Sequence, residues 1–154
     1  MVRVRLAMNL AVLILAIVAL SMEYSDWYAE VLAIKGFKVE AMAANIGLEE
    51  GWPTLRLEVR LSVGGGKSVN VLMLIYSVRL DGKLVRQKAQ NFPGTGLAVS
   101  QEGRSLSIAI RLPKDTPLDS VETGRCMVSV QANLKTRFGV VPVEYRLIPQ
   151  SRHG

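Results

Sequence analysis

Few residues of this 154-residue chain have types and spacing suited to catalysis. The segment GGGKS, residues 64–68, matches the end of a phosphate-binding loop, which wraps a phosphate in successive backbone N–H groups. That motif needs a glycine five positions before Gly66, where the chain has Leu61 within an alternating apolar run, and no helical pattern follows Ser68. We therefore interpret the segment as a hairpin connection.

Histidine and cysteine, the usual bases and nucleophiles, occur once each. His153 is next to the last residue, so the chain has no site with two histidines, and a serine triad would lack its base. Cys126 alternates in phase with Val128 and Val130, which predicts a small buried core residue rather than a reactive thiol. A single cysteine also forms no disulfide within the chain.

The acidic residues are the remaining candidates, because hard cations such as calcium take several carboxylate and carbonyl oxygens. Glu49-Glu50 and the group Asp115, Asp119 and Glu122 lie in expected loops, but neither has a closed ligand spacing. We interpret them as solvated loops, with the second group as the positions to test for an ion. The sequence therefore predicts a non-enzyme without catalytic, cofactor-binding or metal-ligating residues.

An uncharged segment near the N-terminus decides where the rest of the chain lies. Residues 6–22 form 17 consecutive residues without a charge, a helix ~26 Å long that nearly matches the apolar core of a bilayer. Tyr24, Trp27 and Tyr28 follow directly, and such rings prefer the membrane–water boundary. We expect one transmembrane helix that contacts lipid through residues 6–22 and has its boundary at these aromatic residues.

The charges around this segment predict its orientation. Arg3 and Arg5 precede it, and Glu23, Asp26 and Glu30 follow it. The positive-inside rule then predicts a cytoplasmic N-terminus and an extracytoplasmic domain, held at the cell membrane by a single pass. Two alternatives stay open. One is a signal peptide cleaved near Ala19–Ser21, and the other is a pilin-like helix packed in a filament.

After residue 30 the pattern changes to alternation with a period of two, which is typical of half-buried strands. The apolar positions of four runs are Leu55, Leu57, Val59, Leu61 and Val63; Leu106, Ile108, Ile110 and Leu112; Cys126, Val128, Val130, Ala132 and Leu134; and Val141, Val143, Tyr145 and Leu147. Of these, we expect Leu57, Val59, Ile108, Ile110, Val128 and Val130 to form the core between two sheets.

Turn signals separate these runs, and Asp81-Gly82 is a two-residue hairpin candidate, since both positions tolerate a positive φ. Six to eight short strands at this spacing predict a mainly β protein, an antiparallel immunoglobulin- or fibronectin-like β-sandwich. We expect its first strand within residues 33–44. The predicted division is residues 1–30 for the anchor and juxtamembrane segment, 31–149 for the sandwich and 150–154 for a flexible tail.

Residues 71–76, VLMLIY, are apolar on both faces of a strand. We expect a central strand covered on both sides. The alternative is a partly exposed apolar strip, in which Val71, Met73 and Ile75 form an interface with a partner.

Several of these segments resemble a known family. The segments are VNVLMLIYSVRLDGKLV, a loop with Pro93, RSLSIAIRLP, and CMVSVQANLKTRFGVVPVEYRL with Gly139 and Pro142. Together, over about residues 38–147, they resemble the late-embryogenesis-abundant type-two family, also called the water-stress and hypersensitive-response (WHy) domain. The family's Asn-Pro dipeptide is absent, and the chain has VGGGKSVN there.

The resemblance implies an immunoglobulin-like sandwich without a catalytic role, in a family whose archaeal and bacterial members are often tied to a membrane by one N-terminal segment. The family's proposed role is structural or protective.

The charge pattern excludes one further class. The net charge is +6, but the basic residues are scattered and no aromatic–basic stretch marks a base-stacking surface. We therefore expect no nucleic-acid binding. The function predicted from sequence is a membrane-anchored structural, protective or accessory binding module of the cell envelope, with a protein partner or self-association. A filament subunit is the alternative.

Overall fold

A computed structural model of the protein describes the backbone of residues 2–147 and the side chains of residues 10–147. His153 and the predicted tail, residues 150–154, lie outside this range. The described part consists of one long helix, eight strands and a short 3-10 helix. Their bounds are α1 (Val2–Lys35), β1 (Phe37–Glu49), β2 (Trp52–Val63), β3 (Val69–Leu80), β4 (Lys83–Asn91), β5 (Leu97–Val99), β6 (Arg104–Arg111), η1 (Leu118–Ser120), β7 (Cys126–Thr136) and β8 (Gly139–Leu147).

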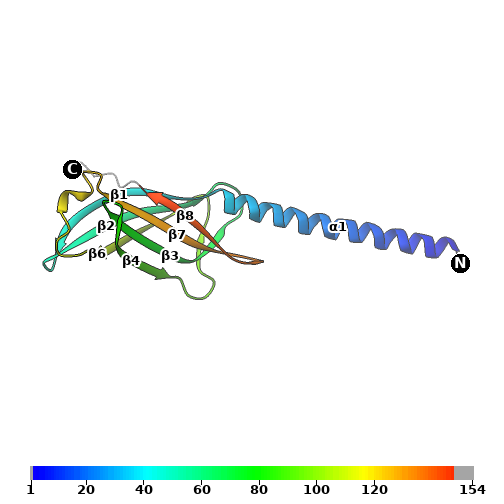
Figure 1. The fold of residues 1–154 in the computed structure, drawn as a ribbon. Helices are drawn as coiled ribbons and strands as arrows, with labels where there is room; N and C mark the ends of the chain where they lie inside the picture. The colour runs from blue at the N-terminus through cyan, green and yellow to red at the C-terminus, as the bar shows by residue number, and fades with distance from the viewer. Residues whose placement is uncertain (1, 148–154) are drawn as a thin grey trace.

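The strands form two antiparallel sheets that face each other, and α1 projects from one end of them (Figure 1). One sheet has the order β1-β2-β6, and the other has the order β4-β3-β7-β8, with β5 paired to β3. The chain changes sheets after β2, after β5 and after β6, so each sheet holds strands that are distant in sequence. This arrangement confirms the predicted mainly β, immunoglobulin-like sandwich.

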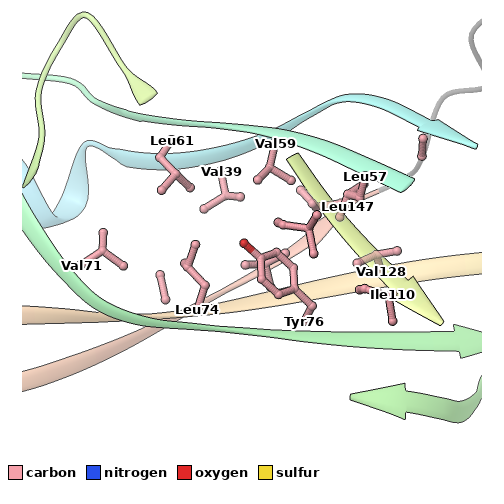
Figure 2. Close-up of a cluster of buried hydrophobic side chains, with 14 of the residues drawn as sticks. Val39, Leu57, Val59, Leu61, Val71, Leu74, Tyr76, Ile110, Val128 and Leu147 are labelled. Carbon is pink, nitrogen blue, oxygen red and sulfur yellow. The ribbon is translucent and has the colours of Figure 1, made fainter. Parts of the chain in front are cut away.

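The core lies between the sheets and follows the alternation of the sequence (Figure 2). All six residues predicted for it are buried: Leu57, Val59, Ile108, Ile110, Val128 and Val130. Cys126 is also buried, as predicted. Burial raises the pKa of its thiol to about 11, and the thiol is therefore protonated near neutral pH, the form that is neither nucleophile nor metal ligand.

Strand β3 contains an irregularity that changes which side chains face the core. Its pairing with β7 shifts between Val71 and Met73. Such a bulge adds one residue to a strand and moves the following side chains to the other phase. Val71 therefore lies fully buried in the core, as do Leu74 and Tyr76 further along. Including Val71 in a surface strip was wrong.

The predicted Asp81-Gly82 turn is confirmed between β3 and β4. Asp81 has φ 49° and Gly82 has φ 80°, and Leu80 pairs with Lys83 across the turn. Positive φ at both central residues is the geometry of a type I′ hairpin. The guanidinium of Arg125 donates two hydrogen bonds to the Asp81 carboxylate. This contact holds the pKa of Asp81 below its usual value.

The two open flanks of the sandwich are each bridged by one side chain. On one flank Lys88 of β4 donates from Nζ to the backbone carbonyl of Ala109 in β6, at 2.7 Å. On the other flank the Tyr145 hydroxyl of β8 donates to the carbonyl of Phe37 in β1. The strands at both sheet edges are thereby joined to the opposite sheet.

Helix α1 extends further than the alternation of the sequence indicates. It ends at Lys35, and the Gly36 N–H still donates to the carbonyl of Leu32. Strand β1 then covers Phe37–Glu49. Its start lies within the expected residues 33–44, but its end lies five residues beyond them. Because only Gly36 separates α1 from β1, the helix enters the sandwich without a flexible linker.

Candidate membrane-proximal site

The exposed apolar surface of α1 is the first element of this site. Nine apolar side chains between residues 10 and 22 expose half or more of their surface, and the sandwich covers no side of this part of the helix: Leu10, Val12, Leu13, Ile14, Leu15, Ile17, Val18, Leu20 and Met22. By length and composition, Leu10–Lys35 is the one helix in the described chain that could cross a membrane. The orientation of this helix stays a prediction.

The predicted boundary residues form a cluster on the helix after the apolar segment. The ring centroids of Tyr24 and Trp27 are 5.7 Å apart, and the rings of Tyr24 and Tyr28 stack at 6.4 Å. All three side chains are exposed. Their spacing of three and four residues places them on neighbouring positions of the helix surface. Their contact with a membrane stays a prediction.

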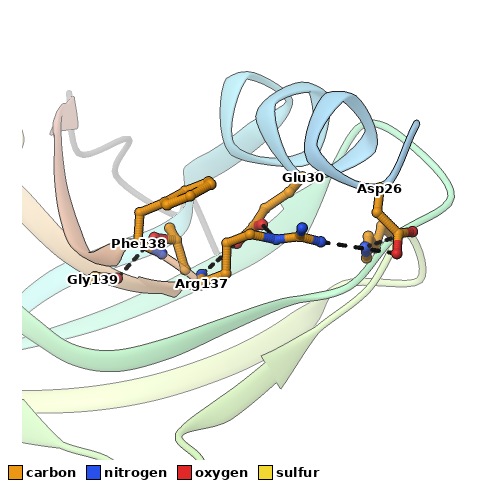
Figure 3. Close-up of polar contacts among 7 residues, drawn as sticks. Asp26, Glu30, Arg137, Phe138 and Gly139 are labelled. Atoms are coloured by element: carbon orange, nitrogen blue, oxygen red, sulfur yellow. Dashed lines mark hydrogen bonds and ion pairs between the residues drawn. The ribbon is translucent and has the colours of Figure 1, made fainter. Parts of the chain in front are cut away.

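Two acidic residues on the same helix bind the sandwich (Figure 3). Glu30 accepts hydrogen bonds from the backbone N–H and the Nε of Arg137, both at 3.0 Å. Asp26, one turn earlier, lies 3.5 Å from Lys67 Nζ and 3.9 Å from an Arg137 guanidinium nitrogen. Lys67 belongs to the β2–β3 loop and Arg137 to the β7–β8 turn. The acids therefore join the helix to two separate connections of the sandwich.

These ion pairs orient the helix more than they stabilise the protein. Exposed pairs contribute only ~0–1 kcal/mol each, and the Asp26 side chain is largely exposed. The Glu30 side chain is 19% exposed and takes two hydrogen bonds from one residue. We therefore regard the contact between Glu30 and Arg137 as the one that fixes the position of the β7–β8 turn beside the helix.

A close approach of two backbones completes the junction. The Gly64 N–H donates to the Gly36 carbonyl at 2.8 Å. A Cβ atom added to Gly36 would lie 2.4 Å from the Gly64 carbonyl oxygen, far inside ordinary contact distance. Only glycine at position 36 permits this packing. Ala33 and Phe37, on either side of it, are buried against the core.

The residues considered for chemistry are not brought together in the described part of the chain. Glu49 and Glu50 pair instead with Arg56 and Arg111, at 2.6 Å and 2.9 Å. Among the described side chains, no three of His, Cys, Asp and Glu form a group suited to a metal ion. Asp115, Asp119 and Glu122 therefore do not make a ligand set here.

Met73 and Ile75 remain candidates for an interface after Val71 is removed. They lie on the outer face of the four-stranded part of the second sheet, opposite Asn91 and Ala89 of β4, and are partly exposed. They point away from the buried Leu74 and Tyr76. Their role in binding a partner stays a prediction.

We expect Met73→Asp to leave the domain folded and Val71→Asp to unfold it. A carboxylate on the outer face stays solvated, whereas one in the core loses its hydration without a partner. Thermal unfolding followed by circular dichroism should show a cooperative transition for the first variant and none for the second. If both variants unfold, Met73 is buried in the protein's native assembly, and if both fold, the assigned phase of β3 is wrong.

Sequence reasoning missed the partners of the acidic residues. It identified Asp26 and Glu30 only as charges after the apolar segment. Their spacing of four residues was a detectable signal that both carboxylates share one helix face. Lys67 and Arg137 are 41 and 111 residues beyond Asp26 in the chain, and no local pattern connects them to it.

Comparisons with known proteins add a likeness of fold. No family model matches the chain, and no curated protein matches it. Among solved structures, a crystal structure of a protein from Archaeoglobus fulgidus is similar, with a TM-score of 0.46 at 15% identity, over 71% of this chain and 90% of that chain. The solution structure of a protein described as late embryogenesis abundant has a TM-score of 0.49 at 9% identity, over 80% of this chain and 83% of that chain.

A third similar structure is much larger. The β-glucuronidase of Parabacteroides merdae has a TM-score of 0.36 at 18% identity, and the match covers 70% of this chain but 13% of that chain. The fold assignment of this protein therefore stands on its own sheet order and register.

Proposed function

We propose that the protein is a single-pass membrane protein whose β-sandwich acts outside the cytoplasm as a non-catalytic structural, protective or accessory binding module. The observation that carries this proposal is the exposed surface of α1 from Leu10 to Met22. A helix that is apolar on all sides is stable only when lipid or other helices surround it. A bilayer provides such surroundings for a helix of this length.

The charge pattern supports the proposed orientation. Arg3 and Arg5 precede the apolar segment, and the next basic residue in the chain is Lys35. Lys35 is 13 residues beyond Met22, ~20 Å along the helix. Basic residues close to the segment thus lie on its N-terminal side, which favours a cytoplasmic N-terminus.

The non-catalytic part of the proposal is supported by what Cys126 and the acidic residues do in the fold. The thiol is buried and protonated, and Glu49, Glu50 and Asp81 are each paired with an arginine. Membership of the WHy family is part of the proposal and is supported by the sequence resemblance over residues 38–147. A membrane-held sandwich of this kind would act through contacts at its surface.

Cysteine labelling tests the topology, because the native thiol is buried and gives a low background. We expect a membrane-impermeant maleimide to label Leu84→Cys, at the exposed start of β4, in intact spheroplasts. It should label Val2→Cys only after permeabilisation, and the unmodified chain should stay unlabelled in both. The reverse pattern would contradict the orientation. Recovery of the chain as long polymers in negative-stain images would instead favour the filament alternative.

A further inference from the structure

The β7–β8 turn exposes an unusual side chain at the end of the sandwich that faces α1. The turn consists of Arg137 and Phe138 between the paired residues Thr136 and Gly139. Phe138 is 76% exposed, and Val140 and Val141 after it are also exposed. Phe138 has no positive φ, so the backbone does not require a special residue there. A polar residue would be the usual choice for a solvated turn.

The position of this turn along the helix is fixed by its ion pairs. Arg137 contacts Glu30 and Asp26, so the turn lies beside the part of α1 between these residues, where Trp27 and Tyr28 are also found. Figure 1 shows the β7–β8 hairpin extending past the rest of the sandwich and along the helix. Figure 3 shows Phe138 beside Arg137 in the turn that carries the contacts to Glu30 and Asp26.

The part of α1 beside the β7–β8 turn coincides with the expected surface of a bilayer. A membrane with its headgroups is ~42 Å thick, so its surface lies ~21 Å from the middle of residues 6–22. At a rise of 1.5 Å per residue this distance reaches about residue 28 of the helix. Arg137, which precedes Phe138 in the turn, donates its backbone N–H to Glu30, two residues and ~3 Å beyond this level. The turn therefore lies close to the predicted aromatic boundary, although it is more than 100 residues away in sequence.

We propose that the β7–β8 turn is a second membrane contact, in which Phe138 enters the headgroup layer of the bilayer that residues 6–22 cross. This inference rests on the proposed membrane anchor. Phenylalanine is among the apolar side chains that interfacial segments bury at the boundary between headgroups and acyl chains. Transmembrane helices tilt by about 20° on average from the bilayer normal. For Phe138 to contact the headgroups, α1 tilts in the direction that brings the β7–β8 turn closer to the membrane. The sandwich is then held against the membrane at two points.

Tryptophan fluorescence of the full-length chain in phosphatidylcholine vesicles, with and without brominated acyl chains, tests this contact. Trp52→Phe leaves Trp27 as the reporter of the anchor, and Trp27→Phe leaves Trp52 at the far end of the sandwich. The Phe138→Trp substitution is made in a chain that also carries Trp27→Phe and Trp52→Phe. Met42→Trp in the same background is the matched control, because Met42 is an exposed apolar residue in β1.

We expect bromolipid to quench the Phe138→Trp chain by at least half as much as Trp27, and to leave Met42→Trp and Trp52 nearly unquenched. Quenching of Trp27 without quenching at position 138 would overturn the second contact and leave the anchor in place. Absence of quenching at Trp27 would overturn the anchor and the second contact together. Equal quenching at positions 42 and 138 would also overturn the proposal, because the contact would then not be specific to the turn.

Discussion

Replacing Gly36 with alanine is expected to disrupt the junction between α1 and the sandwich. The added Cβ would lie 2.4 Å from the Gly64 carbonyl oxygen, and the neighbouring atoms are backbone, which cannot rotate away. Overpacking of this kind typically costs ~1–3 kcal/mol, and we expect the upper end of this range. Chemical denaturation in detergent should measure the loss, provided that the transition stays cooperative.

Hydrogen exchange gives a more local measurement of the same change. The Gly64 N–H donates to Gly36, and the Arg137 N–H donates to Glu30, so both amides should exchange faster when the helix moves. Gly47→Ala is the matched control, because a Cβ at Gly47 meets no atom within 4 Å and its φ is not positive. Equal effects of the two substitutions would show that the backbone contact at Gly36 is unimportant.

The second large effect is expected from Ile108→Ala in the centre of β6. Ile108 is buried, pairs with Leu57 in the neighbouring strand and contributes to the core between the sheets. Truncation of such a residue typically costs ~2–5 kcal/mol, since it removes apolar contacts and leaves a cavity. The loss should appear as a lower denaturation midpoint with an unchanged dependence of the unfolding free energy on denaturant.

Ser107→Ala is the control for this experiment, because Ser107 precedes Ile108 on the exposed face of the same strand. We expect a change within ~0.5 kcal/mol, which is usual for surface substitutions. A similar loss of stability in both variants would show that the buried and exposed faces of β6 are wrongly assigned. No loss in Ile108→Ala would show that the predicted core position is not packed.

The strands were predictable where one regular alternation continues from end to end. In β2, β6 and β7 a shift by one residue would expose every aliphatic side chain, so the buried phase is fixed by the sequence itself. In β8 the predicted face is partly correct. Val141 pairs with the buried Leu134, yet it is exposed, and it belongs to the strand at the edge of its sheet.

The remaining features depend on contacts that no local pattern contains. The bulge in β3 changes the phase after Val71, and an unbroken apolar segment gives no sign of it. The length of α1 is set by the docking of Ala33 and Gly36 on the sandwich. The candidate site could be predicted only on its helical side, through Tyr24, Trp27 and Tyr28, because Arg137 and Phe138 reach it through the fold.

The side chains that bridge the two flanks of the sandwich also affect how neighbouring copies of the protein can pair with one another. Proteins confined to a membrane diffuse in two dimensions and meet their copies often, side against side. An unpaired strand edge then invites pairing with the same edge of a neighbour. Lys88 occupies the Ala109 carbonyl at the β6 edge, and its charge repels an approaching copy of itself. On the opposite flank Tyr145 ties β8 to β1. With the proposed membrane anchor, these two contacts would protect the sandwich against lateral sheet growth where copies meet side against side.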